Sequence, residues 1–185
     1  MKNFIQTTYT HISHTATVFA LILLFIQCKK DSPEEISEEE VINSVTLTVT
    51  AADGSSNDYT WNEGESEPTI TLAANTTSNV SIHFYDASDA SDVEDITEEV
   101  IEEADEHFVF YQISSASLSI AAASNDVEDS DGTSINLKTE WTAAGASTGS
   151  VRVYLIHETT SKTGTSRGEL GGSTDVELDF PVTIQ

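Results

Sequence analysis

The segment that decides the fold is Asp175-Val-Glu-Leu-Asp-Phe-Pro-Val-Thr-Ile184, which alternates polar and apolar residues over its whole length. A period of two is typical of a β-strand with one face buried and the other in water. The same alternation marks seven shorter runs upstream, at 45–49, 59–61, 70–72, 80–84, 108–113, 118–122 and 135–141. Short strands at fairly regular spacing, without strand–helix–strand alternation, predict an all-β domain. We expect an antiparallel β-sandwich, Ig-like in general shape.

Two segments depart from this alternation. The run 151–156 is apolar on both faces, so we expect it in the middle of a sheet. In the segment 95–107, Ile96, Val100 and Ala104 recur at four-residue spacing, which predicts one short amphipathic helix. Asp95 followed by Glu98 has the spacing of a capping box at its start. The Gly-, Thr- and Ser-rich segment 159–173 is predicted to be a loop.

The N-terminal region, residues 1–27, has the organisation of an export signal. It contains Lys2, no acidic residue and an apolar run from Val18 to Ile26. That run is shorter than the ~20 apolar residues of a transmembrane helix. Cys28, the only cysteine of the chain, follows directly, so we predict residues 1–27 to be a lipoprotein signal peptide and Cys28 to be the lipidated residue. Phe25 and Gln27 stand where a lipobox normally has an aliphatic and a small residue, which keeps ordinary signal cleavage open as the alternative.

The segment 28–40 is charged and poor in apolar residues, so we predict an acidic flexible tether. The domain proper is then 41–185. An anchored lipoprotein of this kind belongs to the cell envelope, and we expect outer-membrane anchoring with the domain on the periplasmic face or at the cell surface. The membrane is the predicted partner of the N-terminal lipid.

The charge of the chain restricts its other partners. Formal net charge is −25, and all 32 acidic residues lie after Cys28. Nucleic acid is excluded as a partner, because binding phosphate backbones needs clustered lysine and arginine. A large like charge also keeps an exported domain dispersed, so we expect a monomer. The sequence does not identify a protein or glycan partner.

The strongest local candidate for chemistry is the acidic run 126–132. Its carboxylates Asp126, Glu128, Asp129 and Asp131 precede Gly132 and are hard oxygen ligands of the kind that calcium prefers. Against the EF-hand pattern with Gly132 at the sixth position, Val127 and Lys138 stand at the first and twelfth ligand positions, so the pattern fails at both ends. The alternative is an acidic hairpin loop whose Asp-Gly pair makes the turn.

A second candidate is a transition-metal site. Glu103 and His107 are one helical turn apart, and His83 or the pair His157-Glu158 could join them if the fold brings them together. The alternative is structural: Glu103 on a solvated helix face, His107 at the helix end, and His83 and His157 pairing across strands. The serines lie in turn or strand contexts, and no Ser-x-x-Lys motif or phosphate-binding glycine loop is present, so we expect no enzyme and no cofactor.

Several segments resemble one family. These are Cys28-Lys-Lys-Asp31, the run Glu38-Glu-Glu-Val-Ile42 before a Val/Thr strand, Asp95-Ile-Thr-Glu-Glu99 before Glu103-Ala-Asp-Glu-His107, and the ending Thr174–Gln185. They resemble small Bacteroidetes lipoproteins often labelled "type 1 periplasmic binding fold superfamily protein". The resemblance implies an exported lipoprotein but brings no activity or ligand. The label names a fold of two α/β lobes, whereas the strand patterns here predict an all-β domain.

Taken together, the sequence predicts a lipid-anchored β-sandwich that serves as a non-enzymatic interaction module of the envelope or cell surface. The alternative is a periplasmic domain that binds a small ligand or calcium.

Overall fold

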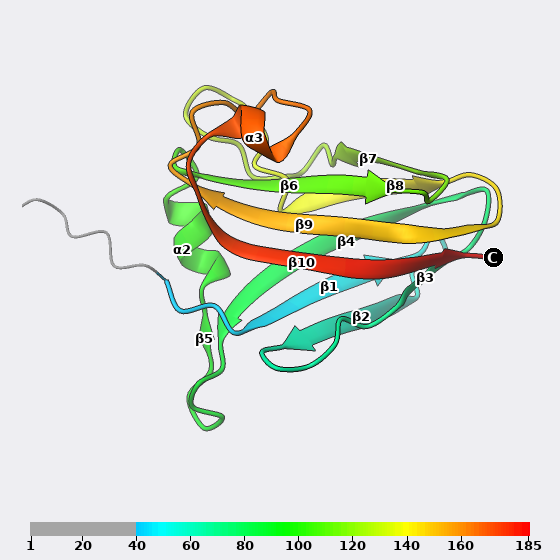
Figure 1. The fold of residues 1–185 in the computed structure, drawn as a ribbon, viewed down its shortest axis with the longest axis horizontal. Helices are drawn as coiled ribbons and strands as arrows, with labels where there is room; N and C mark the ends of the chain where they lie inside the picture. The colour runs from blue at the N-terminus through cyan, green and yellow to red at the C-terminus, as the bar shows by residue number, and fades with distance from the viewer. Residues whose placement is uncertain (1–39) are drawn as a thin grey trace, which may run out of the picture. The chain divides into compact units, whose positions relative to one another are not determined.

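The computed structural model describes residues 40–185, which belong to one compact unit. The predictions for Cys28, for the signal peptide and for most of the tether therefore lie outside the described residues. Within 40–185 the chain forms two β-sheets, packed face to face, and two short helices (Figure 1). The predicted antiparallel β-sandwich is confirmed, and it is open at its sides rather than closed into a barrel.

The first sheet has six strands. In order across the sheet they are β2 (Ser56–Asn62), β1 (Ser44–Thr50), β4 (Thr76–Asp86), β8 (Lys138–Ala143) and β7 (Leu118–Ala122), with the short β5 (Glu94–Asp95) added to the end of β4. All of these pairs are antiparallel. Along β1 the valines and leucine are buried, while the threonines are half-buried and bond across to β2, as between Thr46 Oγ1 and Thr60 Oγ1 at 2.9 Å.

The second sheet has four strands, in the order β3 (Ile70–Leu72), β10 (Ser173–Ile184), β9 (Ser147–His157) and β6 (His107–Ser114). Strands β10, β9 and β6 are antiparallel, whereas β3 runs parallel to the end of β10. The prediction that 151–156 is central is confirmed, because β9 has a neighbour on each side. Its inner face packs in the main core, and its outer face, with Tyr154 and Ile156, packs in a smaller cluster with Phe108 and Leu170.

The main core lies between the two sheets. Trp141, Phe84 and Phe180 are its largest fully buried side chains. The indole Nε1 of Trp141 donates to Thr139 Oγ1 at 2.9 Å, so the largest polar group in the core has a hydrogen-bond partner. The alternating apolar residues quoted from the final strand, Val176, Leu178, Phe180, Val182 and Ile184, are all buried.

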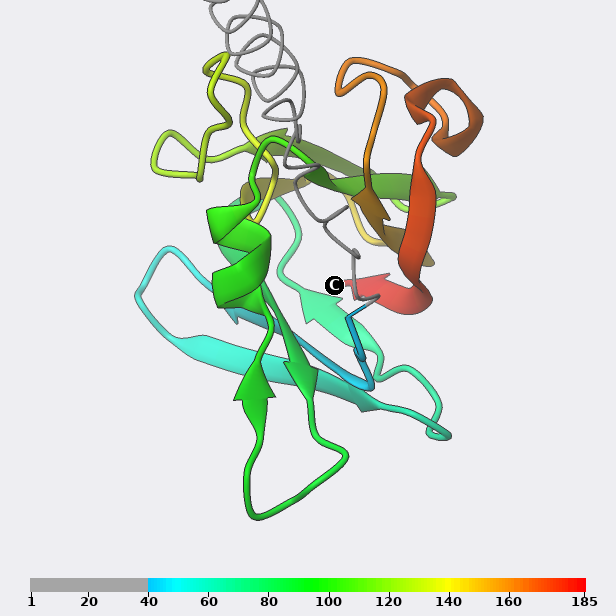
Figure 2. The same cartoon turned by 90° about the vertical axis from the view of Figure 1, so that its left-hand side faces the viewer.

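The helix predicted for 95–107 is shorter than expected. Helix α2 spans Thr97–Glu102 and lies across one end of the sandwich (Figure 2). Its three predicted apolar positions, Ile96, Val100 and Ala104, are buried as expected. The capping box is wrong: Ile96 is the N-cap, and Asp95 accepts from Thr97 N at 3.0 Å while its backbone pairs with β4. The Thr97 hydroxyl bonds the backbone of Phe84 instead, which fixes the helix to β4.

The segment 159–173 is not entirely loop. It contains helix α3 (Arg167–Leu170), with Ser166 and Glu169 forming a capping box. Leu170 is fully buried and covers the outer face of β9 together with Phe108. The Ser166-Arg-Gly-Glu169 spacing was therefore the sequence signal for a helix that the Gly, Ser and Thr content concealed.

Candidate functional site

The acidic loop 126–132 uses part of its charge to hold its own backbone. Both carboxylate oxygens of Asp126 accept backbone hydrogen bonds, from Asn136 N at 2.6 Å and from Lys138 N at 2.7 Å. Gly132 has φ +78°, so the Asp-Gly turn takes the left-handed conformation expected of it. Asp126 therefore closes the loop onto the start of β8.

Asp129 is also engaged within the protein. It accepts from Thr133 N at 2.8 Å and Asp131 N at 3.1 Å, and its Oδ2 lies 2.8 Å from Nζ of Lys162. The hydrogen bond from Lys162, followed by that from Thr133, lowers the pKa of the Asp129 carboxyl. Lys162 also donates to Ala104 O at 2.7 Å. The buried ammonium of Lys162 is thus already paired with the Asp129 carboxylate, which a calcium ion would need as a ligand.

The other two predicted calcium ligands, Glu128 and Asp131, are exposed. Within 40–185 there are sets of three histidines or carboxylates whose ligand atoms all lie within 4.8 Å of one another. None of these sets includes a residue of this loop. Asp129 and Asp131 do line, with Asp105, a polar cleft of about 350 Å³. Calcium binding at 126–131 stays a prediction, and the structure does not draw the four carboxylates into one set.

A different group of ligand-type side chains meets where β6 begins and β9 ends, at the end of the sandwich that carries α2 (Figure 1). His107 and His157 lie directly opposite each other in the β6–β9 pair. Their rings are stacked, with centroids 4.7 Å apart and planes 10° from parallel. The expectation that His157 pairs across strands is therefore met by His107. His83 lies on β4 in the other sheet, opposite Thr46, outside these groups.

Carboxylates surround this histidine pair. Nε2 of His107 lies 3.4 Å from Glu40 Oε1, and its Nδ1 lies 4.0 Å from Glu103 Oε2 and 3.3 Å from Glu103 O. Nε2 of His157 lies 3.2 Å from Glu106 Oε2. His107 is fully buried, whereas the side chains of His157 and Glu103 are 12% and 45% exposed. One group of histidines and carboxylates is thus assembled from helix α2, the turn after it and the ends of two strands.

The electrostatics of the group favour a positive charge. Burial is the largest single influence on the pKa of His107 and would lower it, but Glu40, Glu103 O and Asp175 together outweigh burial, and the pKa is raised. Burial raises the pKa of the Glu99 carboxyl, and the nearby charges of Glu40 and Glu103 raise it further. Negative charge is therefore crowded at this end of the domain, around a histidine whose two ring nitrogens both face oxygen atoms.

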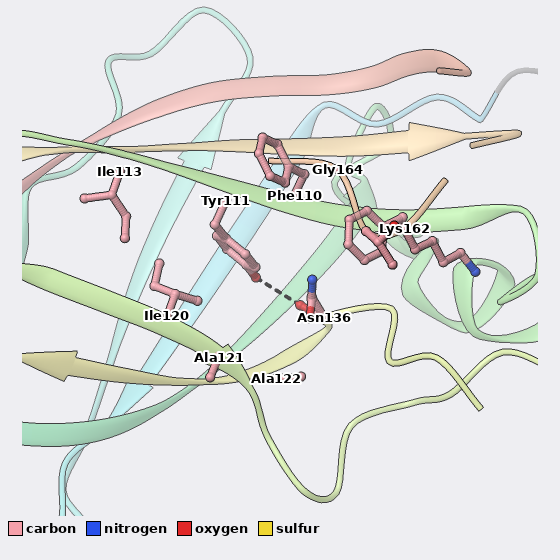
Figure 3. A pocket seen from close by; sticks show the side chains of 11 residues that line it. Phe110, Tyr111, Ile113, Ile120, Ala121, Ala122, Asn136, Lys162 and Gly164 are labelled. Atoms are coloured by element: carbon pink, nitrogen blue, oxygen red, sulfur yellow. Dashed lines mark hydrogen bonds between the residues drawn. The ribbon is translucent and has the colours of Figure 1, made fainter. Parts of the chain in front are cut away.

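A third feature is a groove of about 300 Å³ between β6 and β7, at the open side of the sandwich, where apolar side chains lie beside polar and backbone groups. Tyr111 and Ile113 line it from β6 and Ile120 from β7, while Lys162 and Asn136 stand at one end (Figure 3). The Tyr111 hydroxyl donates to Asn136 O at 3.2 Å. The groove is bordered by edge strands of two different sheets.

The backbone groups along this groove have no strand partner within 40–185. Val109 N donates away from β9, to Ile135 O, so by strand alternation Tyr111 and Ile113 also direct their N–H and C=O away from β9. Ala123 N donates toward β8, to Lys138 O. By the same alternation, Ile120 and Ala122 direct their N–H and C=O groups away from β8. Two open edges therefore face the same groove.

One serine motif was missed by the sequence reasoning. Gly145-Ala-Ser147-Thr-Gly149 has the Gly-x-Ser-x-Gly spacing of a nucleophile elbow. That motif needs a sharp strand-to-helix turn, whereas Ser147 here begins β9, and its Oγ accepts from Ser117 N at 2.9 Å. The local structure is a strand start and lacks the exposed turn of an elbow.

Comparison with protein-family models, with curated proteins and with solved structures finds no match to this chain. Neither helix in the described part of the chain has the length and apolarity of a membrane span. The function must therefore be inferred from the site geometry and the sequence.

Proposed function

We propose that this protein is a lipid-anchored, non-enzymatic interaction module of the cell envelope, whose domain binds an extended segment of a partner polypeptide between β6 and β7. The observation that carries the proposal is the pair of open strand edges facing one groove. An added strand supplies N–H and C=O groups at the spacing of these edges and places alternate side chains in the groove.

The chemistry of the groove favours a polypeptide over a glycan. The unpaired groups of Tyr111, Ile113, Ile120 and Ala122 recur at every second residue, which is the repeat of a β-strand and not of a sugar chain. The net charge of −25 favours a partner that carries basic residues. The expected segment therefore alternates apolar residues with lysine or arginine.

Anchoring is a separate part of the proposal and rests on the sequence. The apolar run before Cys28, the charged run after it and the resemblance to Bacteroidetes lipoproteins support export and lipid attachment at the outer membrane. Mass spectrometry of the mature N-terminus tests this part. We expect a diacylated Cys28, and an unmodified N-terminus produced by ordinary signal cleavage would refute the anchor.

Strand binding can be tested on the full chain with a short synthetic peptide of alternating lysine and valine. Binding should slow amide hydrogen exchange at Tyr111, Ile113, Ile120 and Ala122. A second peptide, N-methylated at its valines, keeps the charge and side chains but loses half of the backbone donors, and it should bind much more weakly.

The matched variant is Ala122→Pro. The Ala122 N–H points away from β8, so proline removes a donor from the groove while the β7–β8 hydrogen bonds remain. Because the Ala122 side chain is exposed, we expect nearly unchanged melting and loss of peptide binding. Equal binding of both peptides, or exchange that slows elsewhere, would show that only charge attracts the peptide. If a soluble glycan instead binds at Phe110 and Tyr111 without slowing amide exchange, the partner is a glycan and the polypeptide proposal is wrong.

A further inference from the structure

The histidine and carboxylate group at the α2 end contains a set of three ligand-type side chains. The ligand atoms of Glu103, His107 and His157 all lie within 4.8 Å of one another. They come from three places in the chain: the turn after α2, the first residue of β6 and the last residue of β9. The β6–β9 register alone sets the two imidazoles opposite each other.

Each imidazole also has a carboxylate of its own. Glu40 lies 3.4 Å from Nε2 of His107, and Glu106 lies 3.2 Å from Nε2 of His157. Histidines that bind metals almost always have such a carboxylate or carbonyl partner, which fixes the ring and raises its basicity. Nε2 of His107 is buried and, although it faces Glu40, the contact is not an aligned hydrogen bond, so a small shift of either group is needed to complete it.

We propose that Glu103, His107 and His157 bind a divalent first-row transition-metal ion, of which zinc is the reference. Two imidazoles and one carboxylate are a common donor set for such ions, and they leave a further coordination position to water or another ligand. The exposed side of Glu103 gives the ion access from solvent. Calcium and magnesium prefer oxygen donors, so this site is chemically distinct from the acidic loop 126–131.

Closing on the ion requires the two imidazole rings to turn out of their stacked arrangement, because each nitrogen lone pair lies in the plane of its ring. Zinc bonds of about 2.0–2.1 Å place tetrahedral ligand atoms roughly 3.3 Å apart. The three ligand atoms are now within 4.8 Å, so the stacked rings must tilt toward each other and Glu103 must move inward. Glu103 is half-exposed and follows a short helix, which makes it the most easily moved of the three. The ion also relieves the repulsion among the carboxylates around His107.

The test is zinc titration of the full chain by calorimetry, with Cys28→Ser as the background so that the only thiol takes no part. Excess calcium in the buffer occupies weak acidic sites on this highly charged chain. We expect one zinc ion per chain and a rise in melting temperature. Cobalt(II) provides a second readout, because tetrahedral coordination gives visible absorption bands that surface carboxylates do not.

His157→Asn and Glu103→Gln should each weaken zinc binding by about tenfold or more, and His157→Asn should abolish the cobalt bands. Matched controls are His83→Asn, a histidine outside the set, and Glu102→Gln, the neighbouring carboxylate on α2. Both controls should bind zinc as the parent chain does. These variants avoid the fully buried His107, so folding can be verified from unchanged melting without metal. Absence of binding at micromolar zinc, or equal binding by His157→Asn and His83→Asn, would overturn the proposal.

Discussion

Replacing Gly149 by alanine should test how tightly the β6–β7 corner is packed. Gly149 lies near the start of β9, beside the turn that joins β6 to β7. A Cβ at this position would lie 2.2 Å from Ser114 O, 2.3 Å from Ala116 N and 2.8 Å from the carbonyl carbon of Ser115. All three atoms belong to the backbone, so a side-chain rotation cannot relieve the contact.

The size of the effect follows from these distances. Ordinary contact begins near 3.4 Å, so the turn or β9 must move by about 1.2 Å. Overpacking in a well-packed interior costs about 1–3 kcal/mol, and the upper end applies here because backbone must shift. For a chain of this size, about 3 kcal/mol corresponds to a fall in melting temperature of roughly 6–12 °C.

The assay is thermal and denaturant unfolding of Gly149→Ala beside Gly145→Ala. Gly145 precedes the same strand, but a Cβ there meets nothing within 4 Å, so this control should be neutral or slightly stabilising. The displaced turn should also widen the groove and weaken the lysine–valine peptide. If Gly149→Ala melts within about 2 °C of the parent chain, less than 1 kcal/mol is lost and the close packing of this corner is refuted.

Two further predictions concern the ion pair between Lys162 and Asp129. Lys162→Met should lower the free energy of unfolding in urea by about 1–3 kcal/mol, because it leaves Asp129 and Ala104 O without their shared donor. The control Lys138→Met, at an exposed position, should change stability little. Equal effects of the two substitutions would contradict this prediction. The folded pKa of Asp129 lies below its unfolded value, so its contribution is complete above the unfolded carboxyl pKa of about 3.9 and is lost as pH falls through the folded value. Unfolding free energies measured in that acid range should therefore fall less steeply in Lys162→Met than in the parent chain, and parallel curves would exclude this carboxyl as the cause.

The sandwich was predictable because burial of one sheet face imposes a local pattern. Val176 to Ile184 alternates in the sequence for the same reason that its apolar residues face the core. The apolar faces of α2 and β9 were predictable on the same ground. The limits of α2 were not, because they depend on the buried Thr97 hydroxyl, which bonds the backbone of Phe84, thirteen positions upstream on β4. Helix α3 was hidden by its composition, although its capping box was in the sequence.

The candidate site was less predictable, because pairing between distant strands sets it. The sequence named Glu103, His107 and His157, but nothing near any of them indicates that β6 and β9 place the two imidazoles opposite each other. The acidic loop shows the converse. Its carboxylates have the chemistry of calcium ligands. Asp126 instead accepts backbone hydrogen bonds from Asn136 and Lys138, and Asp129 accepts one from the side chain of Lys162, farther along the chain.

The open edges and the charge of the chain can be understood together. Strands β6 and β7, His107–Ser114 and Leu118–Ala122, contain no lysine, proline or carboxylate, the residues by which exposed edges usually discourage pairing with a second copy. The net charge of −25 provides that protection at long range, since two copies repel each other before their edges meet. A basic segment is attracted by the same field and then meets unprotected edges. On the proposed function, the acidity that opposes self-association would also select the partner, so raising the ionic strength should weaken peptide binding while making self-association of the chain easier.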